Sequence, residues 1–447
     1  MFGRTLVSLD IADLFGDRAA IGAMLAFERE LARAQVAAGL VPPSSAEAIA
    51  RIAALERPDP DAMVRDAAHA GSLAIPFVKW LRGRVEAHDG DAARHLHLGA
   101  TSQDLLDTAL VLCTRDAVDR IRGHATAAID GAVSLARAHA VDGMTARTLL
   151  QPAGVMTAGL KAARWAASLQ RSLERLDRSS REGLAVSLGG AVGDLAALGN
   201  AGPEVRRDLA RRLGLADPGH AWHTSRERWC GLAADAGILA GSAGKIARDI
   251  SLLCQAEIGE AMEPAAEGRG GSTAMPQKRN PVLSMRILAA VQGVPGRVAD
   301  LLGSMIQEHE RSLGAWQNDM AQVPELYGRV CTALEATATL LEGLRFDSAR
   351  CRSNLDALQG TVMADRVTAL LAGHLGHSEA AALAGRLSTE ALSRKVPLGS
   401  LLSAVIRDDP RLAEVGGQDI ETCLDPAGAI RHAAAETQAV LAGAGLA

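Results

Sequence analysis

The residues best suited to chemistry lie in one glycine-rich segment, EGRGGSTAMPQKRN, which spans residues 267–280. Its glycines give the backbone freedom to bring N–H groups close to a ligand. Ser272 and Thr273 supply hydroxyls, while Lys278 and Asn280 supply a cation and an amide. This set predicts a site that binds and activates an anionic compound. A solvated loop with a basic run has the same composition, so composition alone leaves both interpretations open.

Two more segments place small polar groups at predicted helix starts. Thr101 and Asp104 are spaced as in an N-terminal cap, which leaves Thr101 and Ser102 beside free backbone N–H groups. The Gln-Pro pair at 151–152 and the Asn-Pro pair at 280–281 predict similar helix entries. Helix N-termini attract anions. Three such ends meeting at one place would form a pocket for a compound with several carboxylates.

Long helices are predicted to position these groups. Apolar residues recur on one face from Asp104 to about His139, and a second long run extends from about Arg228 to Met262. Each would be roughly 50 Å long at 1.5 Å per residue, which favours a bundle of long helices. Gly237, Gly241 and Gly244 fall in the second run and predict close approach of another helix, with a kink as the alternative.

The sequence therefore predicts an all-α protein in three parts. Residues 1–103 form an N-terminal helical domain, and residues 104–353 form the long-helix domain that carries a loop at 267–281. After residue 354 the predicted helices become shorter and are punctuated by Pro and Gly. Residues 354–447 are therefore predicted to form a small C-terminal helical domain.

Composition and charge exclude several classes of protein. The 447 residues carry a net charge of −5 and only 2% aromatic side chains, so neither a basic surface nor stacking platforms for nucleic acid are expected. The six cysteines form no CxxC pair, which argues against a disulfide scaffold and a zinc ribbon. We find neither a signal peptide nor an apolar run of membrane-spanning length. These features predict a cytoplasmic protein that binds neither membrane nor nucleic acid.

Three motifs resemble those of a known enzyme family. GSTAMPQKRNP closely resembles the signature loop of the fumarase/aspartase superfamily, HLGATSQDLLDTA resembles its first active-site segment, and RTLLQPA resembles its second. The segments GGAVGDLAALG, WHTSRER and QEHERSLGAW are most similar to the branch of bacterial 3-carboxy-cis,cis-muconate cycloisomerases, which act in protocatechuate breakdown. The resemblance covers nearly the whole chain. It implies a fumarase/aspartase-like homotetramer with a twenty-helix core, no cofactor, and active sites that each combine three segments from three subunits.

The resemblance also assigns roles to individual residues. Ser272 matches the catalytic serine of the signature loop. The positions that match substrate-binding residues are Thr101, Ser102, Thr148, Gln151, Thr273, Lys278 and Asn280.

One departure from the superfamily pattern is informative. The second segment usually reads T-H-x-Q-x-A with a catalytic histidine, but this chain has Leu149 at that position. A poor leaving group such as an amine needs a general acid. A carboxylate does not, because its conjugate acid has a pKa of about 4. The missing imidazole therefore favours a carboxylate, or a similarly good leaving group, over an amine. In lactone chemistry a carboxylate is the nucleophile in one direction and the leaving group in the other.

The resemblance then predicts a mechanism. A carboxylate of a polycarboxylate substrate adds to an alkene carbon, and the neighbouring carboxylate takes up charge as an enolate-like intermediate. Lys278, Asn280 and backbone N–H groups stabilise that charge. Ser272 donates the proton to the α-carbon and acts as the base in the reverse direction.

Three further residues are weaker candidates. His97 and His309 lie in segments that resemble active-site surroundings and are predicted to act as acid or substrate ligand, although a single histidine is more often structural. Arg311 is predicted to clamp a carboxylate. The closely spaced histidine pairs lack nearby cysteines or carboxylates, so no metal site is expected.

Other functions stay open at this stage. The same fold could eliminate another good leaving group, such as nitrite, from a succinate. Adenylosuccinate-type elimination is disfavoured by Leu149. A non-catalytic structural relative is disfavoured by the intact set Ser272, Lys278 and Asn280.

Overall fold

The computed structural model describes residues 7–271, 275 and 278–447, which are mainly α-helical. The all-α prediction is confirmed, with two small two-stranded sheets as the β-structure of the described residues. The chain divides into two compact units. Unit 1 comprises Met1–Ala125, Ser172–Gly244 and Arg286–Ala336, and unit 2 comprises Thr126–Arg171, Lys245–Met285 and Thr337–Ala447. The division into three domains stays a prediction.

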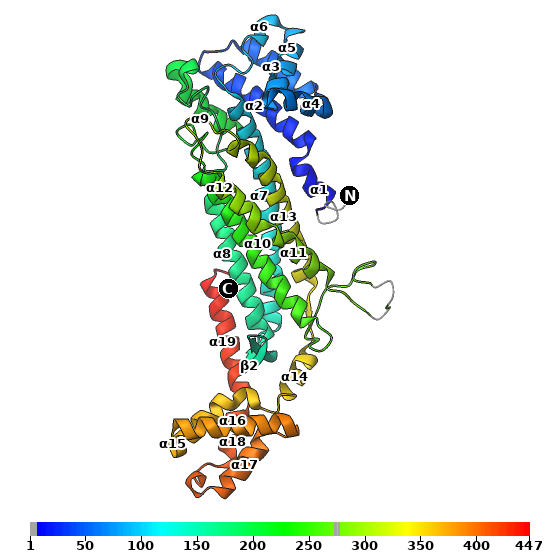
Figure 1. Ribbon diagram of the computed structural model, residues 1–447, viewed down its shortest axis with the longest axis vertical. Coiled ribbons are helices and arrows are strands. Elements are labelled where there is room, and N and C mark those ends of the chain that lie inside the picture. The colour runs from blue at the N-terminus through cyan, green and yellow to red at the C-terminus, as the bar shows by residue number, and fades with distance from the viewer. Residues whose placement is uncertain (1–6, 272–274, 276–277) are drawn as a thin grey trace. The chain divides into compact units, whose positions relative to one another are not determined.

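Five of the described helices have residues in both units. They are α7 (Ser102–Ala138), α8 (Ala158–Gly183), α10 (Glu227–Leu253), α11 (Val282–Gln292) and α13 (Ala315–Gly343), and each is labelled in Figure 1. The long helix predicted from Asp104 is confirmed in α7. The second predicted helix ends earlier than expected, at Leu253, because Gly259 is left-handed (φ 62°) and the N–H of Glu260 turns back to the carbonyl of Leu253.

The glycines of α10 allow close packing within unit 1. A Cβ on Gly237 would lie 2.9 Å from Val298 of α12 (Val294–Gly303), and one on Gly244 would lie 3.3 Å from Val291 of α11. Gly241 faces open space. The prediction of close approach is therefore confirmed at two of the three glycines, and α10 continues through all of them.

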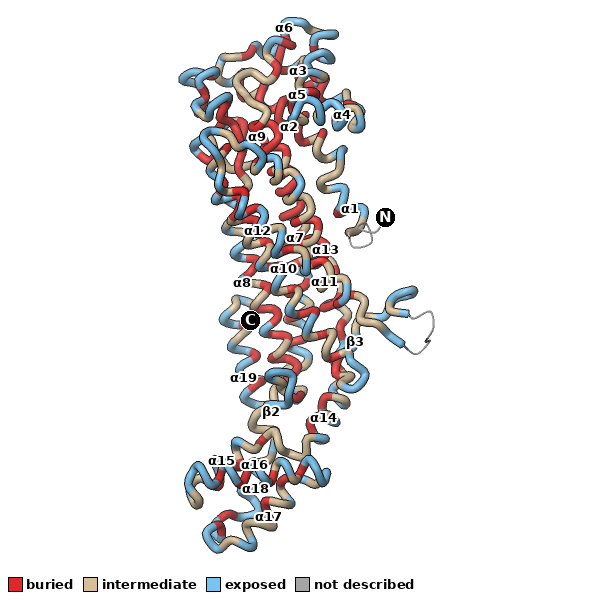
Figure 2. Tube along the Cα trace, in the orientation of Figure 1, coloured by how far each residue is buried: buried red, intermediate tan, exposed pale blue. Residues whose placement is uncertain are grey.

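Unit 1 has a core of its own, built from the N-terminal helices and the start of α7. Phe27, Ile49, Phe77 and Leu105 are completely buried in it, and Figure 2 shows the buried positions of these helices facing one another. The other helices of the unit are α1 (Leu9–Ala12), η2 (Asp13–Phe15), α2 (Asp17–Ala37), α3 (Pro43–Leu55), α4 (Pro60–Ala70), α5 (Ala74–Glu86), α6 (Gly90–Ala93), η3 (Ala196–Ala201) and α9 (Gly202–Leu213).

Unit 2 combines a β-hairpin with the C-terminal helices. A second core, which includes Val367, Leu371, Leu398 and Leu402, lies among α15 to α18. The elements are β1 (Gly143–Thr148), β2 (Gln151–Thr157), β3 (Ala261–Met262), β4 (Arg345–Phe346), α14 (Ser348–Asp356), η4 (Thr361–Met363), α15 (Ala364–Leu375), α16 (His377–Arg394), α17 (Leu398–Asp408), η5 (Pro410–Leu412), α18 (Gly417–Leu424) and α19 (Ala427–Gly443).

The hairpin β1–β2 corrects one prediction. The pair Gln151-Pro152 does not start a helix but opens β2, which runs antiparallel to β1. Leu149 and Leu150 form the turn, and both have positive φ (49° and 67°), as a two-residue hairpin turn of this twist requires. A register shift after Ala146 accommodates Pro152, which cannot donate to the ladder.

Among the described residues, no helix combines the length and apolar character needed to cross a lipid bilayer.

Candidate active site

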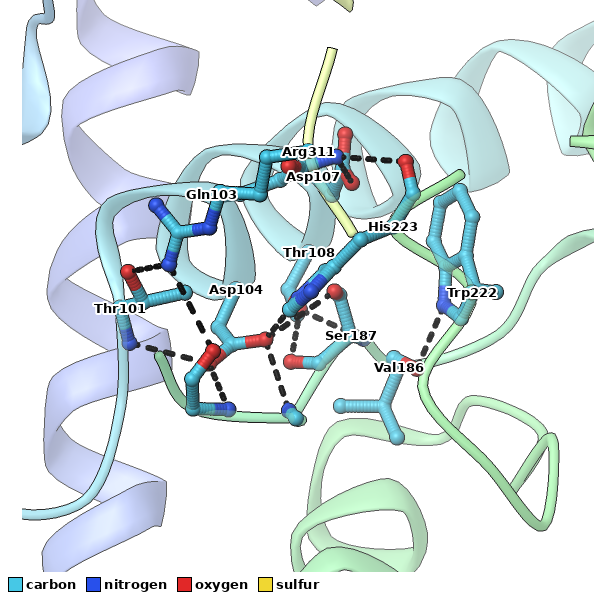
Figure 3. Close-up of polar contacts among 12 residues, drawn as sticks. Thr101, Gln103, Asp104, Asp107, Thr108, Val186, Ser187, Trp222, His223 and Arg311 are labelled. Atoms are coloured by element: carbon cyan, nitrogen blue, oxygen red, sulfur yellow. Dashed lines mark hydrogen bonds and ion pairs between the residues drawn. The ribbon is translucent and has the colours of Figure 1, made fainter. Parts of the chain in front are cut away.

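The best-defined polar cluster surrounds Asp104 in the first turn of α7 (Figure 3). Its side chain is completely buried and accepts five hydrogen bonds, all from the loops around the start of α7. The donors to Oδ1 are Ser187 Oγ (3.3 Å), Gly189 N (2.8 Å) and His223 Nε2 (2.7 Å), and the donors to Oδ2 are Thr101 N and Gly190 N (2.9 Å each). A buried carboxylate with this many donors is held in one place. It fixes the loop before α7 against the segment at 187–190.

Thr101 and Arg311 meet above this carboxylate (Figure 3). A terminal nitrogen of Arg311 donates to the Thr101 hydroxyl, and the same nitrogen lies 3.5 Å from the carbonyl of Gly190. Nε of Arg311 is buried and has no partner among the described residues. A guanidinium with unused donors therefore lies beside the free N–H groups of the α7 N-terminus. We call Thr101, Arg311 and this helix start the anion corner.

Ser102 and Gly99 complete the backbone around the anion corner. Ser102 is the first residue of α7 and is half-buried. Gly99 has φ 72°, and a Cβ there would collide with Leu198. Only glycine fits this turn, which explains the residue before Ala100-Thr101.

His97 lies in the same loop and pairs with a buried carboxylate. Its Nδ1 is 2.5 Å from Oε1 of Glu28, whose side chain is fully buried. Burial lowers the pKa of the imidazole, but the charge and hydrogen bond of Glu28 outweigh burial and raise it above its ordinary value. His97 also has a positive φ of 62°, a strained conformation that is concentrated at functional sites. Glu28 therefore favours the protonated imidazole, the form that carries a proton to donate.

His309 is placed differently. It is exposed on the connection between α12 and α13, with a φ of 49°. The structure brings Arg311 of this connection to Thr101 but gives His309 no such contact among the described residues.

A second polar layer lies one helical turn further along α7. Asp107 accepts two hydrogen bonds from Arg226, at 2.9 and 3.0 Å, and one from Trp316 Nε1 at 2.9 Å. Gln103 joins it through a hydrogen bond to the carbonyl of His223. The two layers together lock the start of α7 to α10 and α13 within unit 1.

The second active-site segment lies at the tip of the hairpin in unit 2. Thr148, Leu149 and Gln151 are all exposed, and 96% of Leu149 is open to solvent. The hairpin is held from below by Arg147, which makes two hydrogen bonds of 2.8 Å to the buried carboxylate of Glu260.

The signature loop also belongs to unit 2. Ser272 and Thr273 lie outside the described residues. Lys278 is exposed, and Asn280 closes the base of the loop by donating its N–H to the carbonyl of Gly270 at 2.9 Å. A cavity of about 330 Å³ at this base is lined mainly by small and apolar residues, with Arg269, Lys278, Arg279 and Glu263 as its charged groups.

The helix after the signature loop differs from the prediction. It begins at Val282, so Pro281 is not its first residue, and Asn280 does not cap it. Glu263 does so instead, because its carboxylate accepts the N–H groups of Leu283 (2.9 Å) and Ser284 (2.8 Å). Of the three helix starts predicted to bind substrate, only that of α7 has the predicted form.

Sequence reasoning assigned no role to several of these groups. The sequence marks Asp104 only as part of a cap, although the structure makes it the centre of the first layer. The sequence gives Glu28 and Arg226 no role, and it marks His223 only as part of a closely spaced histidine pair for which no metal is expected. The available signal was that His223 and Arg226 lie in WHTSRER, a segment whose resemblance to the family was recognised, with polar residues unusual for a buried position.

No group of three or more metal-ligating side chains is arranged to hold a metal ion within the described ranges. Independence of metals and cofactors stays a prediction.

Comparisons with known proteins agree with this architecture. A family model described as lyase matches residues 12–298. The chain belongs to this lyase family, which is the fumarase/aspartase superfamily. Within it, the chain is 44% identical to the 3-carboxy-cis,cis-muconate cycloisomerase of Bradyrhizobium diazoefficiens, over 92% of this chain and 90% of that protein.

Two other relatives are also similar to this chain along most of its length. The crystal structure of the 3-carboxy-cis,cis-muconate lactonizing enzyme from Pseudomonas putida superposes with a TM-score of 0.90 and 38% identity, covering 99% of this chain and 98% of that one. The nitrosuccinate lyase of Streptomyces davaonensis is 39% identical over 92% of this chain and 87% of that protein.

Proposed function

We propose that this protein catalyses the cycloisomerisation of 3-carboxy-cis,cis-muconate to 4-carboxymuconolactone. The observation that carries the proposal is the anion corner, where Arg311 and Thr101 offer a charged and a neutral donor at the start of α7. This is the chemistry that a carboxylate of a tricarboxylic substrate needs. The 44% identity to a cycloisomerase supports the choice of substrate.

In this proposal the substrate is held by its carboxylates while one of them attacks. The anion corner, with Ser102, binds one carboxylate. Lys278 and Asn280 stabilise the negative charge that develops when the ring closes. Ser272 delivers the proton to the α-carbon of the enolate-like intermediate.

The apolar side chain of Leu149 is compatible with this reaction. The hairpin tip carries an apolar side chain where an elimination of amines would need a general acid. The attacking carboxylate is already ionised at neutral pH, so ring closure needs no base at this position. Thr148 and Gln151, beside Leu149, contribute neutral hydrogen-bonding groups to the substrate.

Beside Ser272, His97 is assigned as the second residue that carries a proton. Glu28 favours the charged imidazole, so His97 binds substrate as a cation or shares a proton with it. His309 is assigned to the same role from the exposed connection before α13.

We further propose that the enzyme is a homotetramer with active sites shared between subunits. Several large apolar side chains are exposed on the described chain, and partner subunits would cover them in such a tetramer. They include Leu149 (96%), Leu150 (72%), Ile306 (88%) and Leu313 (90%). All six cysteines are free, consistent with a cytoplasmic enzyme.

A mixing experiment tests the shared site. Ser272→Ala and Arg311→Gln variants are each expected to be inactive and tetrameric. Hybrids formed by co-expression should regain activity, because some sites then receive an intact serine and an intact arginine from different chains. Hybrids without activity would place both residues of a site on one chain and contradict the proposal.

Nitrosuccinate cleavage is the second candidate function. The 39% identity to a nitrosuccinate lyase favours it, and nitrite is also a leaving group that needs no general acid. The two functions are separated by assaying one preparation for lactone formation from 3-carboxy-cis,cis-muconate and for nitrite release from nitrosuccinate. We expect kcat/KM to be higher for the muconate, and the reverse order would select the second candidate.

A further inference from the structure

Two buried carboxylates in unit 1 face a single guanidinium. Arg226 is almost fully buried and lies over the ring of Trp222, with its carbon 4.6 Å from the ring centroid. Its terminal nitrogens are engaged by Asp107 at 2.9 and 3.0 Å. Asp319, on the first turns of α13, approaches the same guanidinium at 3.5 Å. We call Asp107, Arg226 and Asp319 the buried triad.

The two carboxylates of the buried triad are not equivalent. Asp107 also accepts hydrogen bonds from Trp316 and Gln103, so both of its oxygens are satisfied. Asp319 is 1% exposed, and neither of its oxygens has a hydrogen-bond partner among the described residues. An ionised carboxylate left in this state is costly. One arginine cannot neutralise both carboxylates, so we expect Asp319 to carry a proton.

The groups around Asp319 agree with this assignment. The pKa of Asp319 is raised to about 7: burial raises it most, the charge of Arg226 lowers it, the charge of Asp107 raises it, and the nearby Ser304 hydroxyl lowers it. That hydroxyl donates to the carbonyl of Asp300 at 3.0 Å, so within the described structure it leaves the oxygens of Asp319 without a hydrogen bond of good geometry. Cys230 of α10 also faces it, but burial raises the pKa of that thiol to about 12, so the thiol stays neutral. Asp319 is therefore the group in this cluster that changes charge near neutral pH.

Asp319 lies close in sequence to the anion corner. The connection from 304 to 314 carries Arg311 and exposes Ile306 and Leu313. It enters α13 at Ala315, directly before Trp316, which donates to Asp107 of α7, and Asp319, which lies 3.5 Å from Arg226, the residue before α10. Whatever fixes the first turns of α13 thus fixes the end of the connection that carries Arg311.

We propose that Asp319 is a positioning residue for Arg311. In its protonated form Asp319 lets α13 pack against the Arg226–Asp107 pair, and this packing holds Arg311 at Thr101. Ionisation of Asp319 weakens the binding of the substrate carboxylate by Arg311. Ionised Asp319 competes with Asp107 for Arg226, which leaves two buried negative charges to share one guanidinium. The inference rests on the proposed function through the role given to Arg311.

The kinetic test is the pH dependence of KM in wild type and in Asp319→Asn. Asn resembles the protonated acid in shape and charge. For wild type we expect KM to rise by about tenfold as the pH passes through the value near 7, with a smaller change in kcat. For Asp319→Asn we expect KM to stay at its low value. Glu310→Gln is the matched control, since it removes an exposed carboxylate next to Arg311 and should retain the wild-type rise.

A spectroscopic test needs no substrate. Infrared difference spectra between acid and alkaline solution should show the carbonyl band of a buried protonated carboxyl in wild type and in Glu310→Gln, and not in Asp319→Asn. A wild type that turns over substrate with a pH-independent KM, or that lacks the band, overturns the inference. So does an Asp319→Asn variant that fails to fold, because the neutral side chain is then not the native form. Absence of turnover at every pH with the band present would instead refute the proposed function.

Discussion

Asp104→Asn is expected to weaken both folding and substrate binding, because this carboxylate joins the anion corner to the rest of unit 1. The substitution preserves size and shape but replaces one acceptor oxygen by a donor NH₂ group. All five hydrogen bonds to Asp104 come from donors. The amide cannot satisfy them in either orientation.

The magnitude follows from counting the donors left unpaired. If NH₂ replaces Oδ2, the N–H groups of Thr101 and Gly190 face a donor. If it replaces Oδ1, the N–H of Gly189 faces a donor, while Ser187 can turn its hydroxyl. His223 must then accept through Nε2 and carry its proton on Nδ1, which is buried and has no partner in the described structure.

Either orientation therefore leaves two buried donors unsatisfied. At about 1–3 kcal/mol for each, the expected loss of unfolding free energy is about 2–6 kcal/mol. Since Thr101 and Gly190 also contact Arg311, KM should rise by about tenfold or more, equivalent to about 1.4 kcal/mol of binding.

The assay compares Asp104→Asn with Asp116→Asn in chemical denaturation at one protein concentration and in KM. Asp116 lies on the same helix but is exposed and pairs with Arg115 at 3.0 Å, a contact worth about 0–1 kcal/mol. If the two variants prove equally stable and bind substrate equally well, Asp104 does not organise the site and the reasoning fails.

Three further variants test other parts of the structure. Glu28→Gln should lower the pKa of His97 and so move the corresponding limb of the pH profile of kcat/KM to lower pH, and an unmoved limb would separate His97 from that profile. Asp319→Asn should flatten the pH dependence of stability. The pKa of Asp319 is raised in the folded state to about 7 from 3.8, so its contribution to the unfolding free energy is complete below pH 3.8 and is lost as the pH rises through about 7. If the difference in unfolding free energy between wild type and Asp319→Asn does not change with pH in this window, the account of the buried triad is wrong. The double substitution Leu149→Asn/Leu150→Gly should relieve about 1–2 kcal/mol of strain per turn residue yet raise the tetramer dissociation constant at least about tenfold, as read from dilution in mass photometry; unchanged assembly would leave the hairpin tip outside the interfaces.

The long helices were accessible from the sequence because their signal is a repeated period. The apolar face of α7 extends over many turns, so a local irregularity hardly changes the interpretation. The glycines of α10 were also interpretable, since a helix that contains Gly237 and Gly244 needs a reason to tolerate them.

The hairpin was missed because its signals are short and atypical. Its turn is Leu149-Leu150 rather than Asn-Gly, and Pro152 argues against a strand. The two left-handed leucines are strained, and the hydrogen bonds between Arg147 of β1 and Glu260 hold the hairpin in place against that strain. That contact joins residues more than a hundred positions apart, which local periodicity cannot reveal.

The buried polar layers were missed for a related reason. Asp104, Arg226 and Glu263 owe their roles to partners from distant segments, and each reads locally as an ordinary helix-end or surface residue. The signature loop, in contrast, was recognised from its residue types and their order alone.

The central claim is that this chain closes a lactone by carboxylate addition and proton delivery to carbon. The most direct measurement is to incubate the purified protein with 3-carboxy-cis,cis-muconate in D₂O, follow the diene absorbance, and identify the product by NMR. The account predicts loss of the diene and a carboxymuconolactone that carries one deuterium at the α-carbon, with Ser272→Ala inactive. A tetrameric protein that leaves the diene intact, or a product without deuterium at that carbon, would contradict it.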